Sequence, residues 1–184
     1  GPLVPVSTYA ASKIAGEALL SSYAHMFGFQ VVAFRFGNVV GPRQTHGVGF
    51  DFVRRLRRDR DFLEILGDGQ QSKSYVHVDD VVSGVLRAAA VATDPFEVFN
   101  LATGDYITVT EIAELAIECL GFERDALEVR YTGGDRGWKG DVPVMRLTSA
   151  RLEATGWRCG RSSAEALRAA IESMIADDEA GRFD

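Results

Sequence analysis

The sequence contains few of the residues that build metal centres and disulfide frameworks. It has two cysteines, Cys119 and Cys159, and three histidines, at positions 25, 46 and 77, in 184 residues. The cysteines lie far apart without a Cys-x-x-Cys spacing, and the histidines are scattered with no acidic partner at ligand spacing. Zinc sites and disulfide frameworks need closer clusters. We therefore expect no bound metal, no disulfide and a reducing compartment.

Long apolar runs are also missing. No stretch approaches the roughly 18 residues of a membrane-spanning helix, and the first residues lack the charged segment and long apolar core of a signal peptide. The net charge of -6 is opposite in sign to the basic surfaces that bind nucleic acids. The sequence thus predicts a cytoplasmic protein that binds neither membranes nor nucleic acid.

A glycine-rich nucleotide fingerprint is the third absence. A dinucleotide-binding half carries such a turn between its first strand and helix, with an acidic residue about 20 residues later. The glycine clusters of this chain, Gly67 with Gly69 and Gly133 with Gly134, fall instead in predicted turns. We expect no cradle for the phosphates of a dinucleotide within this sequence.

The residues that are present follow the pattern of an α/β domain. Hydrophobic residues make up 46% of the chain and charged residues 25%, which is typical of one globular domain or part of one. Segments with helical spacing alternate with short β-branched or aromatic runs, which favours parallel strand pairing. The expected helices are residues 8–27, 50–58, 80–92 (capped by Asp79), 110–120 and 163–176, and the expected strands are residues 30–36, 62–66, 74–78, 97–101 and 127–131.

Tyr9 and Lys13 are the first pair with chemical meaning. Their four-residue spacing places both side chains on one face of the first expected helix. A phenol with a pKa of about 10 is a weak base at neutral pH, and an ammonium group one turn away stabilises the phenolate. Tyr9 could then accept a proton from a hydroxyl group, although the bare spacing also fits an ordinary surface pair.

Four ordered segments extend this pair into a family pattern. They are YAASKIAGE at 9–17, RFGNVVGPRQ at 35–44, GDG at 67–69 followed by YVHVDD at 75–80, and NLATG at 100–104. In order and spacing the chain resembles the extended short-chain dehydrogenase/reductases. It is most similar to their nucleotide-sugar epimerase/dehydratase branch, and within it to the NAD-dependent 4-epimerases of UDP-sugars. The resemblance covers Tyr9 to about Gly156.

The resemblance implies an α/β fold made of the C-terminal part of a Rossmann-like doubly wound sheet plus a small α/β substrate-binding subdomain. Residues 1–47 and 74–100 would carry the Tyr-Lys helix and the last Rossmann strands. Residues 48–73 and 101–184 would form the substrate-binding subdomain, interleaved with them. Because the N-terminal NAD-binding half is expected to be absent, we expect a piece of a longer enzyme that is inactive alone and homodimeric at full length.

The matched positions imply residue roles. Tyr9 resembles the catalytic base and acid, and Lys13 resembles the residue that lowers its pKa and contacts the nicotinamide ribose of NAD. Phe36 and Gly37 match the segment that lies against the nicotinamide. The expected contacts to the nucleotide-sugar substrate, a UDP-sugar by resemblance, are Asn38, Val48, Lys73, Arg136 and Asp141.

Two positions depart from the family pattern. Lys73 stands where members usually have an arginine; it still neutralises phosphate, but it lacks the planar fork that holds two oxygens. Trp138 stands where many members have another phosphate-binding arginine. Arg136 or Lys139 would then supply that contact, and we favour Arg136, with Asp141 accepting from ribose hydroxyls.

The implied reaction is epimerisation at C4 of a UDP-hexose or UDP-hexuronate. Tyr9 would remove the C4 hydroxyl proton while hydride passes to NAD, and the resulting 4-keto sugar would be reduced on its other face. The related 4,6-dehydratases and 4-reductases are a second interpretation that the sequence leaves open. A third is a non-catalytic nucleotide-sugar-binding module or subunit that a separate cofactor-binding half completes in trans.

Overall fold

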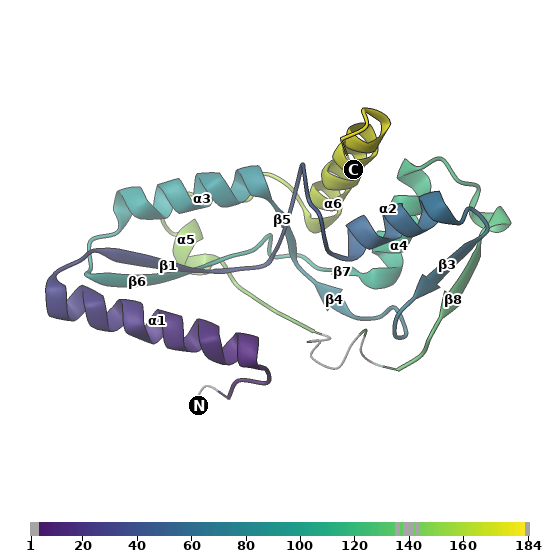
Figure 1. The fold of residues 1–184 in the computed structure, drawn as a ribbon. Helices are drawn as coiled ribbons and strands as arrows, with labels where there is room; N and C mark the ends of the chain where they lie inside the picture. The colour runs from purple at the N-terminus through teal and green to yellow at the C-terminus, as the bar shows by residue number, and fades with distance from the viewer. Residues whose placement is uncertain (1–3, 135–136, 138–141, 143, 183–184) are drawn as a thin grey trace.

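The computed structural model describes residues 4–134, 137, 142 and 144–182. Helices and strands alternate along the chain as the hydrophobic pattern predicts, so the protein is an α/β protein (Figure 1). The helices are α1 (Thr8–Phe27), α2 (Val48–Arg58), α3 (Val78–Val91), α4 (Val109–Cys119), α5 (Ala150–Glu153) and α6 (Ser163–Glu179), with a 3-10 helix at Arg124–Ala126. The strands are β1 (Val31–Phe36), β2 (Asn38–Val40), β3 (Phe62–Ile65), β4 (Ser72–Lys73), β5 (Tyr75–His77), β6 (Phe96–Leu101), β7 (Ile107–Thr108) and β8 (Glu128–Tyr131).

The strands of the described residues pair two by two. β1 pairs with β6, β2 with β5 and β3 with β8, each in parallel. This confirms the expected parallel pairing. β4 and β7 form a short antiparallel pair, which was not expected because a two-residue strand shows no period in the sequence.

Two hydrophobic clusters build the core. The larger lies among α2, α4, α6 and β3 and includes Leu56, Leu63 and Ile171, which are fully buried. The smaller lies where α3 and α5 pack on β6 and includes Leu101 and Leu152. β5 runs between the two regions (Figure 1), and β2 pairs with it. The expected division of the chain into two interleaved parts stays a prediction.

α1 is defined by its caps and packs lightly on the rest of the protein. Ser7 Oγ accepts from the Ala10 N–H at 3.1 Å, and Gly28 ends the helix in the left-handed conformation at φ 72°. Ala24 is the one buried residue of α1, although the helix contacts β1 and β6. Met26 and other apolar side chains stay exposed, and the expected homodimer stays a prediction. No helix in the described part of the chain is long and apolar enough to cross a membrane.

α3 begins at Val78, before the expected cap. The His77 side chain accepts from the Asp79 N–H at 3.2 Å, so His77, and not Asp79, caps the helix. The expectation for Asp79 was therefore wrong. The two aspartates that follow point apart, since the side chain of Asp79 is 70% exposed and that of Asp80 is 10% exposed.

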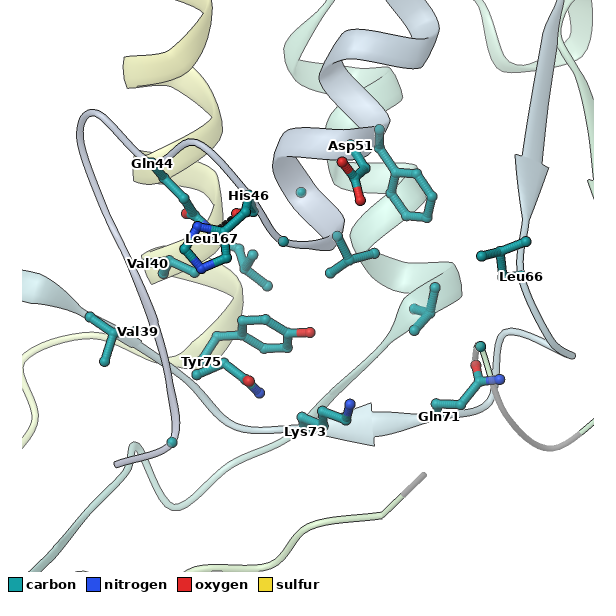
Figure 2. A pocket seen from close by; sticks show the side chains of 18 of the residues that line it. Val39, Val40, Gln44, His46, Asp51, Leu66, Gln71, Lys73, Tyr75 and Leu167 are labelled. Carbon is teal, nitrogen blue, oxygen red and sulfur yellow. Dashed lines mark hydrogen bonds between the residues drawn. The ribbon is translucent and has the colours of Figure 1, made fainter. Parts of the chain in front are cut away.

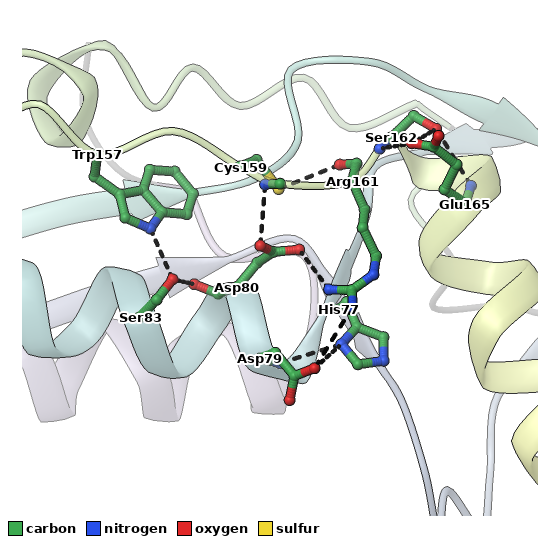
Figure 3. Close-up of polar contacts among 10 residues, drawn as sticks. His77, Asp79, Asp80, Ser83, Trp157, Cys159, Arg161, Ser162 and Glu165 are labelled. Carbon is green, nitrogen blue, oxygen red and sulfur yellow. Dashed lines mark hydrogen bonds and ion pairs between the residues drawn. The ribbon is translucent and has the colours of Figure 1, made fainter.

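Asp80 fastens the segment between α5 and α6 to the start of α3 (Figure 3). Its Oδ1 accepts from the Gly160 N–H at 3.0 Å, and its Oδ2 lies 3.5 Å from Arg161 Nη1. The Trp157 indole N–H donates to Ser83 Oγ at 3.0 Å one turn further along α3. These contacts fix where α6 begins.

Candidate active site

Tyr9 and Lys13 lie together on an exposed face of α1. Lys13 Nζ is 5.2 Å from the centre of the Tyr9 ring, a distance at which an ammonium group and an aromatic ring attract each other. Tyr9 is 71% exposed, so the ring is open to a ligand. The structure thus brings the expected base and its helper together, on an open surface.

An ion pair turns this face of α1 toward the end of β1. Arg35 Nε donates to Glu17 Oε2 at 3.0 Å. Glu17 follows Lys13 by four residues and Tyr9 by eight, and such spacings share one helix face. Phe36 follows Arg35 but stacks on Phe34, at 5.7 Å between ring centres. Alternate strand residues share a face, so the Phe36 ring does not lie on the side of β1 that carries Arg35.

The Tyr9 face fits the nicotinamide end of NAD. Lys13 offers an ammonium donor for ribose hydroxyls beside the exposed phenol of Tyr9. A Cβ added at Gly16, one turn after Lys13, would meet no atom within 4 Å, so the neighbouring helix surface is open to a flat ring. The turn that would hold the pyrophosphate is absent from the 184-residue sequence. The residues present therefore fit that one end of the cofactor.

A cavity of about 650 Å³ lies beside β2, β4 and the start of α2 (Figure 2). Its volume is within the range of small-molecule binding sites. The expected site residues that line it are Gly37, Asn38, Val48 and Lys73. The lining does not include Tyr9, Lys13 or Phe36, and Arg136 and Asp141 lie outside the described residues.

Gly37 and Asn38 connect the β1 side of the molecule to this cavity. The Gly37 N–H donates to Leu101 O at 2.9 Å, and a Cβ here would lie 3.2 Å from Ser74 O, so glycine lets the chain pass close to β5. Asn38 then pairs with Tyr75 in the β2/β5 ladder. Its backbone N–H and its Nδ2 both donate to Ser74 O, at 2.9 and 3.3 Å. The Asn38 amide is therefore held at the edge of the cavity nearest β1.

A chain of hydroxyl groups, which sequence reasoning missed, holds Ser74. Ser74 Oγ lies 2.7 Å from Thr103 Oγ1, which lies 2.9 Å from Ser163 Oγ. Ser163 Oγ donates to Asp105 Oδ1 at 2.8 Å. Burial raises the pKa of Asp105, but hydrogen bonds from Thr103 and Ser163 outweigh burial and hold that pKa below its usual value. The carboxylate thus remains an acceptor at neutral pH.

Lys73 lines the cavity together with Gln71 and Tyr75, which alternate with it along the chain. The intervening Ser72 lies on the other side, where its Oγ accepts from Arg146 Nη2 at 3.0 Å. Figure 2 shows Lys73 reaching into the cavity between Tyr75 and Gln71. Gln71 was not expected from the sequence; its spacing of two residues from Lys73 is the signal that could have found it.

The other charged residues of the cavity lining are Asp51, Arg55 and Glu64. Arg55 Nη1 donates to the backbone O of Glu64 at 3.0 Å and so ties α2 to β3. Within the described residues, no three or more His, Cys, Asp or Glu side chains are grouped to hold a metal ion. The arrangement suits an organic ligand that carries negative charge near Lys73.

Known proteins resemble the chain along most of its length. It matches the NAD dependent epimerase/dehydratase family over residues 1–102. GDP-mannose 3,5-epimerase of Arabidopsis thaliana is 30% identical over 91% of this chain and 44% of its own length. A crystal structure of UDP-galactose 4-epimerase is 37% identical, with a TM-score of 0.83 over 96% of this chain and 56% of that one. The UDP-glucose 4-epimerase of Thermotoga maritima, solved with UDP-glucose, is 32% identical, with a TM-score of 0.81 over 94% and 55%.

The chain spans about half the length of these relatives. The structural matches confirm a Rossmann-like α/β fold. They do not support the expectation that the chain is the C-terminal part of such an enzyme.

Proposed function

The chain belongs to the NAD dependent epimerase/dehydratase family, and from that premise we propose that it supplies the proton-transfer and substrate-binding residues for epimerisation of a nucleotide sugar. The proposed substrate is a UDP-hexose or UDP-hexuronate, and the proposed position is C4. The observation that carries the proposal is the connection between two features. The exposed Tyr9–Lys13 pair lies on α1, which contacts β1, and β1 leads through Gly37 directly to the cavity with Asn38 and Lys73.

In the proposed reaction Tyr9 exchanges a proton with the sugar. Its phenolate removes the proton of the C4 hydroxyl and later returns it. Lys13 stabilises the negative charge of the phenolate from one helical turn away. NAD, when bound, accepts and returns the hydride. Asn38 and Lys73 hold the diphosphate, which keeps the reacting hydroxyl at Tyr9.

Lys73→Ala is expected to weaken UDP binding by about tenfold, because a charge-assisted contact to phosphate contributes about 1.5 kcal/mol. Isothermal titration calorimetry of the 184-residue chain with UDP measures this. Lys73→Arg keeps the positive charge and adds a planar guanidinium that can bind two phosphate oxygens. This variant should bind UDP at least as tightly as the parent chain.

Arg58→Ala is the matched control for Lys73→Ala. It also removes one positive charge, but Arg58 is exposed on α2 and does not line the cavity. UDP affinity should stay within about twofold in this variant, since isolated surface charges contribute little. Unchanged UDP binding in Lys73→Ala would remove Lys73 from the proposed diphosphate site.

The 184-residue chain alone is expected to bind UDP-sugars without converting them, because its sequence has no turn for the dinucleotide phosphates. Conversion of UDP-galactose to UDP-glucose with added NAD measures this, and turnover by the chain alone would contradict it. Recovery of turnover on adding a separate dinucleotide-binding polypeptide would favour completion in trans. A 4-keto-6-deoxy product would favour the dehydratase interpretation.

A further inference from the structure

The cavity contains a buried amide that nothing in the described part of the chain satisfies. Gln71 is 3% exposed, and neither its Nε2 nor its Oε1 has a hydrogen-bond partner among those residues. Burying an amide that has no hydrogen-bond partner costs free energy, and native proteins pair nearly all of their buried polar groups. The exception at Gln71 therefore requires a reason.

Gln71 is held so that its side chain meets the cavity. Its backbone O accepts from the Val109 N–H at 3.1 Å, which fixes the chain against the start of α4. It shares a face with Lys73 and lines the same cavity. In Figure 2 the Gln71 amide lies to the right of Lys73 and below Leu66. Its neighbour Gln70, by contrast, is exposed.

The order of the residues along the cavity indicates which part of a bound nucleotide sugar would lie at Gln71. Asn38 lies at the end next to β1, the strand that α1 contacts, and Lys73 follows. Gln71 lies beyond Lys73, on the side of Leu66, which follows β3 (Figure 2). A nucleotide sugar with its sugar at Tyr9 and its diphosphate at Asn38 and Lys73 extends its nucleoside toward Gln71.

We propose that Gln71 binds the nucleobase of the nucleotide sugar. Its Nε2 donates to a ring carbonyl while its Oε1 accepts from the adjacent ring N–H, a pair that the imide edge of uracil offers side by side. Leu66 and Val109 also line the cavity, Val109 being joined to Gln71 by a backbone hydrogen bond, and both provide apolar contact for a flat ring. This inference rests on the proposed function, because the order of groups is counted from Tyr9.

If Gln71 binds a ligand, Gln71→Met should have two opposite effects: it should stabilise the free protein and weaken UDP binding. Methionine fills a similar volume without polar atoms, so it removes the unpaired amide from the free protein. The melting temperature should therefore rise by about 2–4 °C. UDP affinity should fall about tenfold, because the buried base edge loses both partners.

The test measures two ligands on two variants of the 184-residue chain. Calorimetric titration compares UDP with ribose 5-diphosphate, which has no base, and thermal unfolding gives the melting temperature. Gln71→Met should weaken UDP binding about tenfold and leave ribose 5-diphosphate binding unchanged. Gln70→Met, the control at the exposed neighbour, should change neither ligand affinity.

Equal losses for both ligands, or unchanged UDP affinity in Gln71→Met, would overturn the assignment to the base. If the parent chain binds none of UDP, dTDP and GDP, the proposed function fails first and the inference fails with it. If Gln71→Met does not fold, the same interaction can be tested on the parent chain with a modified ligand. UDP methylated at N3 lacks the ring N–H and should bind the parent chain about tenfold more weakly than UDP; equal affinity would also overturn the proposal.

Discussion

Tyr9→Phe is expected to lower turnover by about 10²–10⁴-fold in a polypeptide that joins residues 1–184 to a dinucleotide-binding half. The substitution removes only the hydroxyl group, so the ring and its contact with Lys13 remain. UDP affinity should not change, because Tyr9 does not line the cavity that contains Asn38 and Lys73. The measurement is kcat for interconversion of UDP-galactose and UDP-glucose, with UDP titration beside it.

Tyr23→Phe controls for the loss of a phenol from the same helix. Tyr23 lies on α1, is 52% exposed and has no place in the proposed chemistry. Its replacement should leave kcat within about twofold, as for most exposed substitutions. If Tyr9→Phe and Tyr23→Phe turned over equally fast, Tyr9 could not be the base.

Asp80→Ala is expected to lower the free energy of unfolding by about 2–3 kcal/mol. Asp80 is 8% exposed, and its removal leaves the Gly160 N–H without its acceptor and Arg161 without its nearer carboxylate. The segment that leads into α6 would then lose its attachment to α3. Urea denaturation followed by circular dichroism measures the change.

Asp79→Ala is the control at the adjacent aspartate. The Asp79 side chain is 70% exposed and lies 3.7 Å from Arg161 Nη2. An exposed ion pair contributes little, so the expected loss is about 0.5 kcal/mol. Equal losses in the two variants would mean that burial of Asp80 contributes nothing beyond a surface charge.

Local sequence signals predicted most of the fold. α1 begins after Ser7 and ends before Gly28, because cap residues act on their immediate neighbours. The β1 and β6 strands were visible as short β-branched and aromatic runs. The cap of α3 was misjudged because His77 and Asp79 both offer acceptors at its start. Only the folded geometry shows that the His77 ring nitrogen meets the N–H.

For the candidate site, the sequence pointed to individual residues but did not show which of them lie together in the folded protein. Asn38 and Lys73 share a cavity, whereas Tyr9 and Lys13 lie on a separate open face. Gln71 was missed because a glutamine in a turn-rich segment is ordinarily exposed. Its burial involves a tertiary neighbour, the start of α4, that lies far away in the sequence. The hydroxyl chain behind Ser74 depends on the same long-range packing.

The Glu17–Arg35 contact, which joins the Tyr9 helix to β1, is an ion pair whose strength depends on dissolved salt. The Arg35 side chain is 51% exposed and that of Glu17 27%, while α1 buries a single residue, Ala24. At physiological ionic strength the screening length is about 8 Å, and added salt shortens it further. Counter-ions therefore compete with this contact more effectively than with any interaction in the protein core. Tyr9, the base of the proposed reaction, therefore lies on a helix whose ion pair with β1 weakens as the salt concentration rises.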